Sequence, residues 1–303
     1  MRVRSVIWEW WSFRLDKVKM VMLIGFVCLA GAGCAGQESE DTDSEAVEDQ
    51  APAVVETTAP AVEGTETAVP TVEAPPTSET AEAEASEAEA WLQSQFEYLG
   101  LTTELFPTGA GGSNNVIAYQ TGFEYPETYV VIGGHYDSIV FDGGDPRVWA
   151  PGADDNASGT VGALEAARIL ANVDLDCTVK FACWSAEEIG LLGAQHYAQN
   201  ASRQGENIAL YINYDMIANV NPNDPVLDVN VGRNATGMAR SYSNLMLQIA
   251  DEYTTLVAHP YTTQGGGSDH SPFIQHGYDI LYAHEGDFSP HWHEGTDVVD
   301  NMD

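Results

Sequence analysis

Two hydrophobic periods alternate along the C-terminal two thirds of the chain. Helical spacing of apolar residues is clear in residues 90–99, a segment that ends at Gly100. Short runs of consecutive or alternating apolar residues predict strands. The predicted strands are residues 129–132, 177–184, 208–214 and 226–231, and the predicted helices are residues 90–99, 160–170, 189–198 and 238–253.

This alternation predicts an α/β domain with a mixed, mostly parallel central sheet and helices on both faces. Ligands of such sheets bind beside the carboxyl ends of the strands. The chemically capable side chains follow the predicted strands or open the helix after the first one: His135, Asp137, Asp155, Glu187, Glu188 and Asp215. Each alone has a structural explanation, such as a turn or a helix cap. Together they are expected to converge at one edge of the sheet.

Such a cluster needs positive charge, because neighbouring carboxylates repel one another and some would otherwise stay protonated. Two divalent cations would balance Asp155, Glu188, Asp215 and a bridging hydroxide, which leaves Glu187 to move protons. Imidazole and carboxylate donors without thiolate favour zinc, with cobalt or manganese as substitutes. Two such ions can activate water and polarise a carbonyl oxygen, so the pattern indicates hydrolysis.

The N-terminal segment reads as an export signal. Basic residues precede an apolar run at 21–30 that is too short to span a bilayer stably, which predicts a signal peptide over residues 1–36. Residues 29–34 (LAGAGC) resemble a bacterial lipoprotein box, with Cys34 as the lipidated residue. Plain secretion and a retained anchor are the alternatives. The protein is therefore expected to be an exported cell-envelope lipoprotein or a secreted protein.

Residues 37–88 are rich in Glu, Ala, Thr and Pro and show no helical or strand period. Low apolar content and repulsion between carboxylates predict a disordered acidic linker. The predicted domain is residues 89–303.

The chain carries 46 acidic and 11 basic residues, a formal net charge of −35. This charge excludes the basic surface that nucleic-acid binding requires. Membrane contact is expected only through the lipid anchor. Cys177 and Cys183 flank residues 178–182 of one predicted strand. Six residues of strand span about 20 Å, which is too far for a disulfide between the two. No disulfide is expected.

Five motifs together resemble the bacterial two-zinc aminopeptidases, the leucyl aminopeptidase type of zinc exopeptidase. The motifs are residues 133–138 (GGHYDS), 151–159 (PGADDNASG), 184–193 (WSAEEIGLLG), 213–216 (NYDM) and 268–273 (SDHSPF). In that family a last histidine ligand stands four residues before an aspartate, a spacing that His293 and Asp297 have. The resemblance runs from about Trp91 to the C-terminus and implies peptide substrates.

The resemblance implies two zinc ions and their ligands. The implied ligands are Asp155 as the bridge, Glu188 and His293 on one ion, and His135 and Asp215 on the other. His291 is the alternative to His293, whereas His270 is expected to be a structural residue. Asp154 is not expected to be a ligand.

The resemblance also implies the chemistry. Glu187 acts as general base and then acid for the attack of a metal-bridging hydroxide on the scissile carbonyl. Asp137 orients His135 without touching the metal. The peptide bond between Asp155 and Asn156 is expected to be cis.

The chain departs from the resemblance in four places. Some members have a carbonyl-polarising tyrosine where this chain has Gly265 or Trp292, so that role stays unassigned. Glu294 stands where threonine often follows the last ligand. No final helix is expected after Asp297. No inserted accessory domain is expected between residues 99 and 129.

An aminopeptidase is the preferred function, because the negative domain charge attracts a free amine better than a free carboxylate. The alternatives are a carboxypeptidase, a glutaminyl-cyclase-like transferase and a non-enzymatic surface lipoprotein on the same fold. The cyclase type uses one zinc ion, which the presence of both His135 and Asp215 disfavours. Binding proteins of this kind lose metal ligands, and all five candidate positions are filled here.

Overall fold

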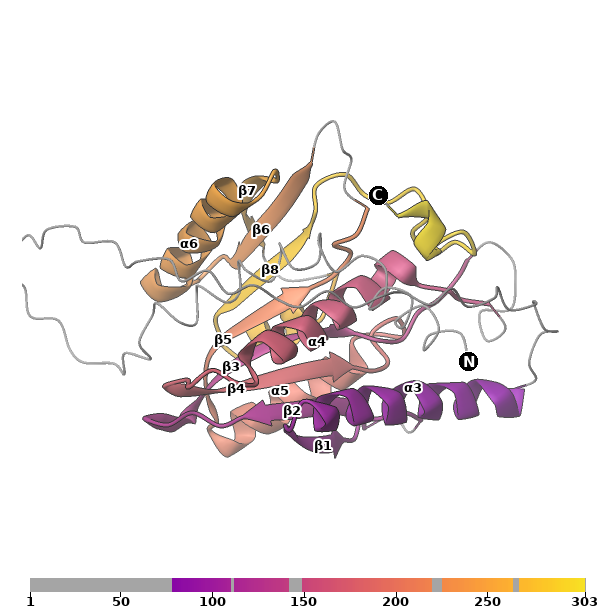
Figure 1. The fold of residues 1–303 in the computed structure, drawn as a ribbon, viewed down its shortest axis with the longest axis horizontal. Coiled ribbons are helices and arrows are strands. Elements are labelled where there is room, and N and C mark those ends of the chain that lie inside the picture. Colours follow the sequence, from indigo (N-terminus) through magenta and orange to yellow (C-terminus); the bar gives the residue numbers. More distant parts are fainter. Residues whose placement is uncertain (1–77, 110–111, 142–148, 220–224, 264–266, 303) are drawn as a thin grey trace, which may run out of the picture. The chain divides into compact units, whose positions relative to one another are not determined.

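The computed structural model describes residues 78–109, 112–141, 149–219, 225–263 and 267–302 (Figure 1). The predicted signal peptide, residues 37–77 of the predicted linker and Gly265 lie outside this part of the chain. Within it, no helix combines the length and the apolar character needed to cross a membrane.

The described residues form one mixed sheet and its covering helices. The strands are β1 (Thr102–Phe106), β2 (Asn115–Gln120), β3 (Tyr125–His135), β4 (Cys177–Trp184), β5 (Asn207–Tyr214), β6 (Val226–Gly232), β7 (Val257–Thr263) and β8 (Ile280–Glu285). The helices are α3 (Ser78–Tyr98), α4 (Gly159–Leu170), α5 (Leu192–Gln204), α6 (Gly237–Tyr253) and α7 (His270–Gln275), with the short turns η1 (Ala153–Ser158) and η2 (Val299–Asn301).

The strand order across the sheet is β1-β2-β4-β3-β5-β8-β6-β7. The four central strands β4, β3, β5 and β8 run parallel. At one edge β1 and β2 are antiparallel, and at the other β6 is antiparallel to β8 and parallel to β7. The predicted mixed, mostly parallel sheet is confirmed. Because the central strands share one direction, their carboxyl ends meet at one edge.

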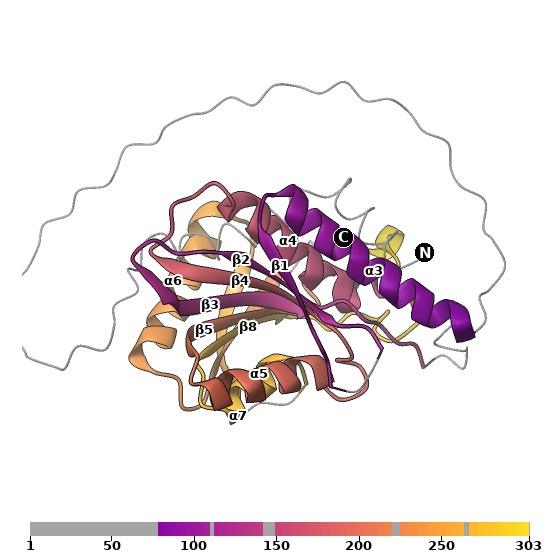
Figure 2. The same cartoon turned by 90° about the horizontal axis from the view of Figure 1, so that it is seen from below.

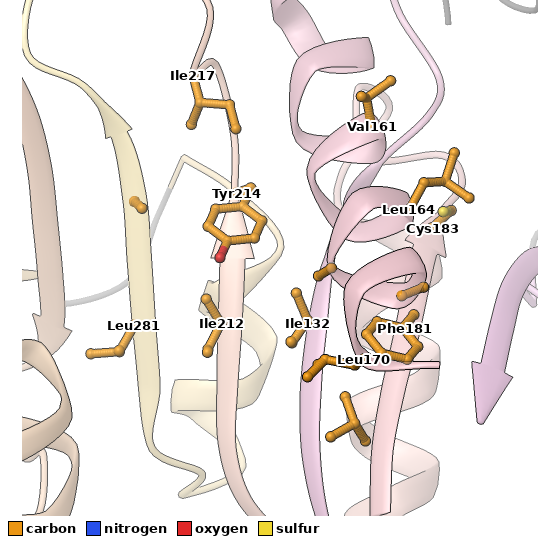
Figure 3. Close-up of a cluster of buried hydrophobic side chains, with 14 of the residues drawn as sticks. Ile132, Val161, Leu164, Leu170, Phe181, Cys183, Ile212, Tyr214, Ile217 and Leu281 are labelled. Atoms are coloured by element: carbon orange, nitrogen blue, oxygen red, sulfur yellow. The ribbon is translucent and has the colours of Figure 1, made fainter. Parts of the chain in front are cut away.

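Helices cover both faces of the sheet, as predicted (Figure 2). Residues of α3, α4 and α6 pack with one face in a single apolar cluster, and residues of α5 and α7 pack with the other face. Consecutive strand residues supply opposite clusters: Ile212 belongs to the first and Tyr211 to the second. Figure 3 shows Ile132, Phe181 and Ile212 of the sheet together with Leu164 and Leu170 of α4, all members of the first cluster.

Helix α3 starts at Ser78, ahead of the predicted domain start at residue 89. The segment 78–88 consists mainly of Glu and Ala, both good helix formers, and Ala88 is buried. Helix α5 begins at Leu192 rather than residue 189, because Gly190 and Leu191 have positive φ angles of 118° and 60°. Elements β1, β2, β7, β8 and α7 are not predicted by the hydrophobic pattern.

The two described cysteines differ in state. Cys183 is a free, buried thiol, so the pairing that strand geometry excludes is absent. Cys177 is disulfide-bonded, and its partner lies outside the described residues. The prediction of no disulfide is therefore wrong for Cys177, because the length of the strand excludes only its pairing with Cys183.

Candidate metal centre

Strand ends bring the predicted site residues together. His135 is the last residue of β3, Asp215 directly follows β5, and the turn after β4 carries Glu187 and Glu188. Asp155 lies in η1, which leads from the loop after β3 into α4. His135, Asp155 and Asp215 are each 5% exposed or less.

Two groups of three candidate metal donors share Asp155. One consists of His135, Asp155 and Asp215, and the other of Asp155, Glu188 and His293. Asp155 Oδ1 lies 3.3 Å from His135 Nε2, while Asp155 Oδ2 lies 3.1 Å from His293 Nε2. The two oxygens of one carboxylate thus face two separate donor sets, which is the arrangement expected of a bridging ligand.

The remaining distances complete the two sets. Asp215 Oδ1 lies 3.4 Å from His135 Nε2, and Glu188 Oε2 lies 2.9 Å from His293 Nε2. Glu187 stands beside both: its Oε2 is 4.0 Å from His135 Nε2, and it forms a further group with His135 and Glu188. All six predicted residues that could touch metal or water therefore lie in one cluster.

Asp137 holds the backbone of the two glutamates and the ring of His135. Its two carboxylate oxygens accept the backbone N–H groups of Glu187 and Glu188, each at 3.1 Å. The ring of His135 is oriented by Asp137 as predicted, but the hydrogen bond at 3.0 Å joins Nδ1 to the backbone carbonyl of Asp137. The carboxylate Oδ1 is 3.7 Å from Nδ1. One residue thus positions groups from two strands.

Asp297 holds the backbone of η1. Its carboxylate oxygens accept the N–H groups of Asp154 at 2.9 Å and Asp155 at 3.0 Å, and its own carbonyl accepts the N–H of Ala153. The Asp155–Asn156 peptide bond is cis, as predicted. Asp297, four residues after His293, thus joins the last loop to the turn that carries Asp155.

Asn156 also fixes η1. No role is predicted for its side chain from the sequence. Its side-chain Nδ2 donates to the carbonyl of Tyr214 at 3.0 Å, next to Asp215. Its Oδ1 accepts the N–H of Gly159 at 2.9 Å. Its place directly after the bridging aspartate was the signal available in the sequence.

Charges within the cluster shift the pKa values of its members. Burial disfavours a charge on His135, yet the Glu187 carboxylate raises the pKa of this imidazole well above its ordinary value. Burial would raise the pKa of Asp155, but the imidazoles of His135 and His293 lower it to about 2. Burial raises the pKa of Glu187 to about 8 and that of Glu188 to about 7. The cluster therefore favours added positive charge.

The donors fit zinc. They are imidazole nitrogens and carboxylate oxygens, with no cysteine among them. Glu188 Oε1 is buried and has no hydrogen-bond partner among the described residues, so it is available to a cation. Burial, shared carboxylate and donor chemistry all suit one or more metal ions.

The competing histidines lie elsewhere. Nδ1 of His291 is 2.9 Å from Thr296 Oγ1, and His291 belongs to none of the three donor groups. His270 is buried and stacks on Tyr282, with ring centroids 4.2 Å apart. Of the histidines in the described last loop, His293 is the one that meets the cluster.

Residues 115–303, more than half of the chain, match the sequence model of peptidase family M28. The chain belongs to peptidase family M28. The matched residues include all five motifs, among them the paired glutamates after β4 and the aspartate in η1. They also form most of the sheet and contain the metal-donor groups at its carboxyl edge.

Similar proteins carry peptidase names. A "probable zinc metalloprotease" of Pyrenophora tritici-repentis is 34% identical over 190 residues, 54% of this chain and 44% of that protein. A "probable leucine aminopeptidase 2" of Arthroderma benhamiae is 36% identical over 165 residues, 53% of this chain and 31% of that protein. Both relatives are fungal. The resemblance to the bacterial members in particular therefore stays a prediction.

A solved structure has the same fold. A zinc aminopeptidase from Bacillus subtilis is 29% identical with a TM-score of 0.53, covering 64% of this chain and 46% of that one. The chain thus spans less than half the length of each of these three proteins.

Proposed function

We propose that this M28 peptidase is a zinc-dependent aminopeptidase that uses two zinc ions to remove N-terminal residues from peptides. The observation that carries the proposal is the Asp155 carboxylate, whose two oxygens face His135 and His293 at 3.3 and 3.1 Å. A carboxylate placed between two donor sets suits a pair of ions about 3.5 to 4 Å apart. The names of the relatives support peptidase chemistry.

In the proposed site, His135 and Asp215 hold one ion, Glu188 and His293 hold the other, and Asp155 bridges them. When bound, the ions supply Lewis acidity that polarises the scissile carbonyl and activates water. Cobalt or manganese would serve with the same donors.

Glu187 moves the proton in this scheme. Its carboxylate lies beside the ligands without belonging to either Asp155-centred group, and Asp137 fixes its backbone N–H. Glu187 accepts a proton from the attacking water and returns it to the amine when the C–N bond breaks. In the metal-free chain, burial raises the pKa of this carboxyl to about 8.

Charge supports cleavage at the amino end. The chain has a formal charge of −35, and a peptide's free amine is drawn to such a protein while a free carboxylate is repelled.

The test pairs metal content with substrate blocking. Full chain loaded with zinc is expected to hold two ions and to hydrolyse carboxyl-blocked peptides, while amino-blocked peptides are left intact. Cleavage of amino-blocked peptides instead would identify a carboxypeptidase. One ion together with cyclisation of N-terminal glutamine would identify a cyclase, and two ions without hydrolysis would favour a binding protein.

We also propose export and lipidation at Cys34, which rest on the sequence of residues 1–36 alone. Expression with a radiolabelled fatty acid in a bacterial host is expected to label the parent chain and not the Cys34→Ser variant. Label on both chains would contradict lipidation at this residue.

A further inference from the structure

The imidazole of His293 is held differently from that of His135. His135 Nδ1 hydrogen-bonds to the carbonyl of Asp137 at 3.0 Å, which leaves Nε2 for a metal. His293 Nδ1 is buried and has no hydrogen-bond partner among the described residues. Metal-binding histidines almost always donate their second N–H to an oxygen, which fixes the ring. A different contact must therefore orient His293.

Two aromatic rings enclose this imidazole. Trp292 stacks on it with ring centroids 3.8 Å apart and an interplanar angle of 22°. Phe141 meets it nearly at a right angle, at 4.7 Å and 88°. Together the two contacts restrict rotation of the ring about its side-chain bonds, because offset-stacked and T-shaped pairs are both preferred aromatic geometries.

The backbone fixes the Phe141 contact. The N–H of Phe141 donates to the carbonyl of His293 at 2.8 Å, which joins the segment after β3 to the last loop. His293 itself has a φ angle of 56°, in the left-handed region that few residues other than glycine adopt. The contact between the two rings is thus set by a direct main-chain bond between their own residues.

We propose that Phe141 is a positioning residue which, with Trp292, holds the His293 imidazole for metal binding in place of the usual hydrogen bond. This inference rests on the proposed function, in which His293 is a zinc ligand. Removal of the Phe141 ring frees the imidazole to rotate and opens Nδ1 to water. The ion held by Glu188 and His293 is weakened, whereas the ion held by His135 and Asp215 is not.

The chain offers a matched control. Phe141 is 66% exposed and Phe288 is 61% exposed, so loss of either ring removes little from the core. Phe288 meets Trp292 at 5.1 Å between ring centroids and makes no ring contact with His293. Phe288→Ala therefore removes a similar aromatic surface, here from beside Trp292, without touching the imidazole directly.

The experiment compares full-length Phe141→Ala, Phe141→Tyr and Phe288→Ala with the parent chain. Each is loaded with zinc and titrated with a chelator, and each cobalt-substituted chain is examined by visible absorption. In Phe141→Ala, the affinity for the ion held by Glu188 and His293 is expected to fall by about 10- to 100-fold. The cobalt spectrum should change as well. The affinity for the other ion should stay the same. Phe141→Tyr and Phe288→Ala are expected to match the parent.

His293→Ala separates this inference from the proposed function. If His293→Ala binds zinc as the parent does, the ligand assignment fails, and the inference fails with it. If His293→Ala loses one ion while Phe141→Ala keeps both at parental affinity, the inference is overturned and the proposed function stands. Equal weakening by Phe141→Ala and Phe288→Ala would also overturn it, because the effect would then belong to the aromatic surface in general.

Discussion

Adjacent glutamates after β4 have different environments although their backbones are held alike. Asp137 accepts both backbone N–H groups at 3.1 Å. Glu188 then reaches His293 at 2.9 Å, while Glu187 stays 4.0 Å from His135. In the proposed mechanism, this one-residue difference separates the metal ligand Glu188 from Glu187, which carries the proton.

Glu187→Gln is expected to keep both metal ions and the fold, because the amide occupies the same volume beside the ligands. It cannot accept a proton, so kcat should fall by roughly 10²-fold or more. Zinc content and kcat on an aminoacyl substrate at saturating zinc measure the two effects. Loss of a zinc ion in this variant would reverse the roles of Glu187 and Glu188.

Glu188→Gln is expected to weaken one metal ion. Metal that binds only the folded state stabilises it, so the variant should gain less in Tm from added zinc than the parent does. Thermal unfolding with and without zinc measures this gain. An undiminished zinc-dependent shift would show that Glu188 is not a ligand.

At the scale of elements, the site depends on how η1 is tied to the last loop. Asp297 is 2% exposed and satisfies two buried N–H groups, those of Asp154 and Asp155. Leaving each buried N–H without a partner costs about 1 to 3 kcal/mol. Loss of these two hydrogen bonds would therefore destabilise η1, the turn that holds Asp155.

Asp297→Ala is therefore expected to lower Tm by several degrees and to weaken zinc binding at both positions, because Asp155 serves both. Thermal unfolding of the metal-free chain and chelator titration measure the two changes. Asp300→Ala removes a nearby exposed carboxylate and should leave both values unchanged. Similar losses in both variants would attribute the effect to charge rather than to the backbone contacts.

The end of β8 carries a buried acid, Glu285, which is 2% exposed and accepts the N–H groups of Ser289 and Asn219. Burial, and then the charge of Asp154, raises the pKa of Glu285 from 4.5 to about 10. Because the folded state binds this proton more tightly than the unfolded state, its contribution to stability is complete below pH 4.5. The contribution is lost as the pH rises toward 10.

The metal-free chain is accordingly expected to lose Tm progressively between pH 5 and pH 10, and Glu285→Gln should flatten the decline. Thermal unfolding across this range measures both slopes. A variant whose Tm falls as steeply as that of the parent would show that another group is responsible.

The whole molecule carries a formal charge of −35, so repulsion between carboxylates opposes its compact state. Added salt screens this repulsion. Tm of the metal-free chain should therefore rise between about 0.02 M and about 0.5 M sodium chloride, where the Debye length shrinks to a few ångströms. The rise should diminish near pH 4.1, the sequence pI, where the net charge vanishes. A salt effect independent of pH would argue against charge repulsion.

Strong local patterns were sufficient for the central elements. The segment 177–184 is predicted with the bounds that β4 has, because six of its eight residues are apolar, and all eight are buried in the structure. Strand β1 was missed, because its polar residues lie at an exposed edge and its pairing with β2 comes from the sheet rather than from its own composition.

The sequence by itself determined which donors the site has and that they follow parallel strands, since each motif is short and its residue types carry the chemistry. Only the tertiary structure decided which contacts hold and orient these donors. The two oxygens of Asp155 face different histidines, Asp137 uses its carbonyl for His135 and its carboxylate for the glutamates, and Phe141 reaches His293 from a distant segment. Such contacts depend on the relative placement of loops joined across the sheet, and no local spacing encodes that placement.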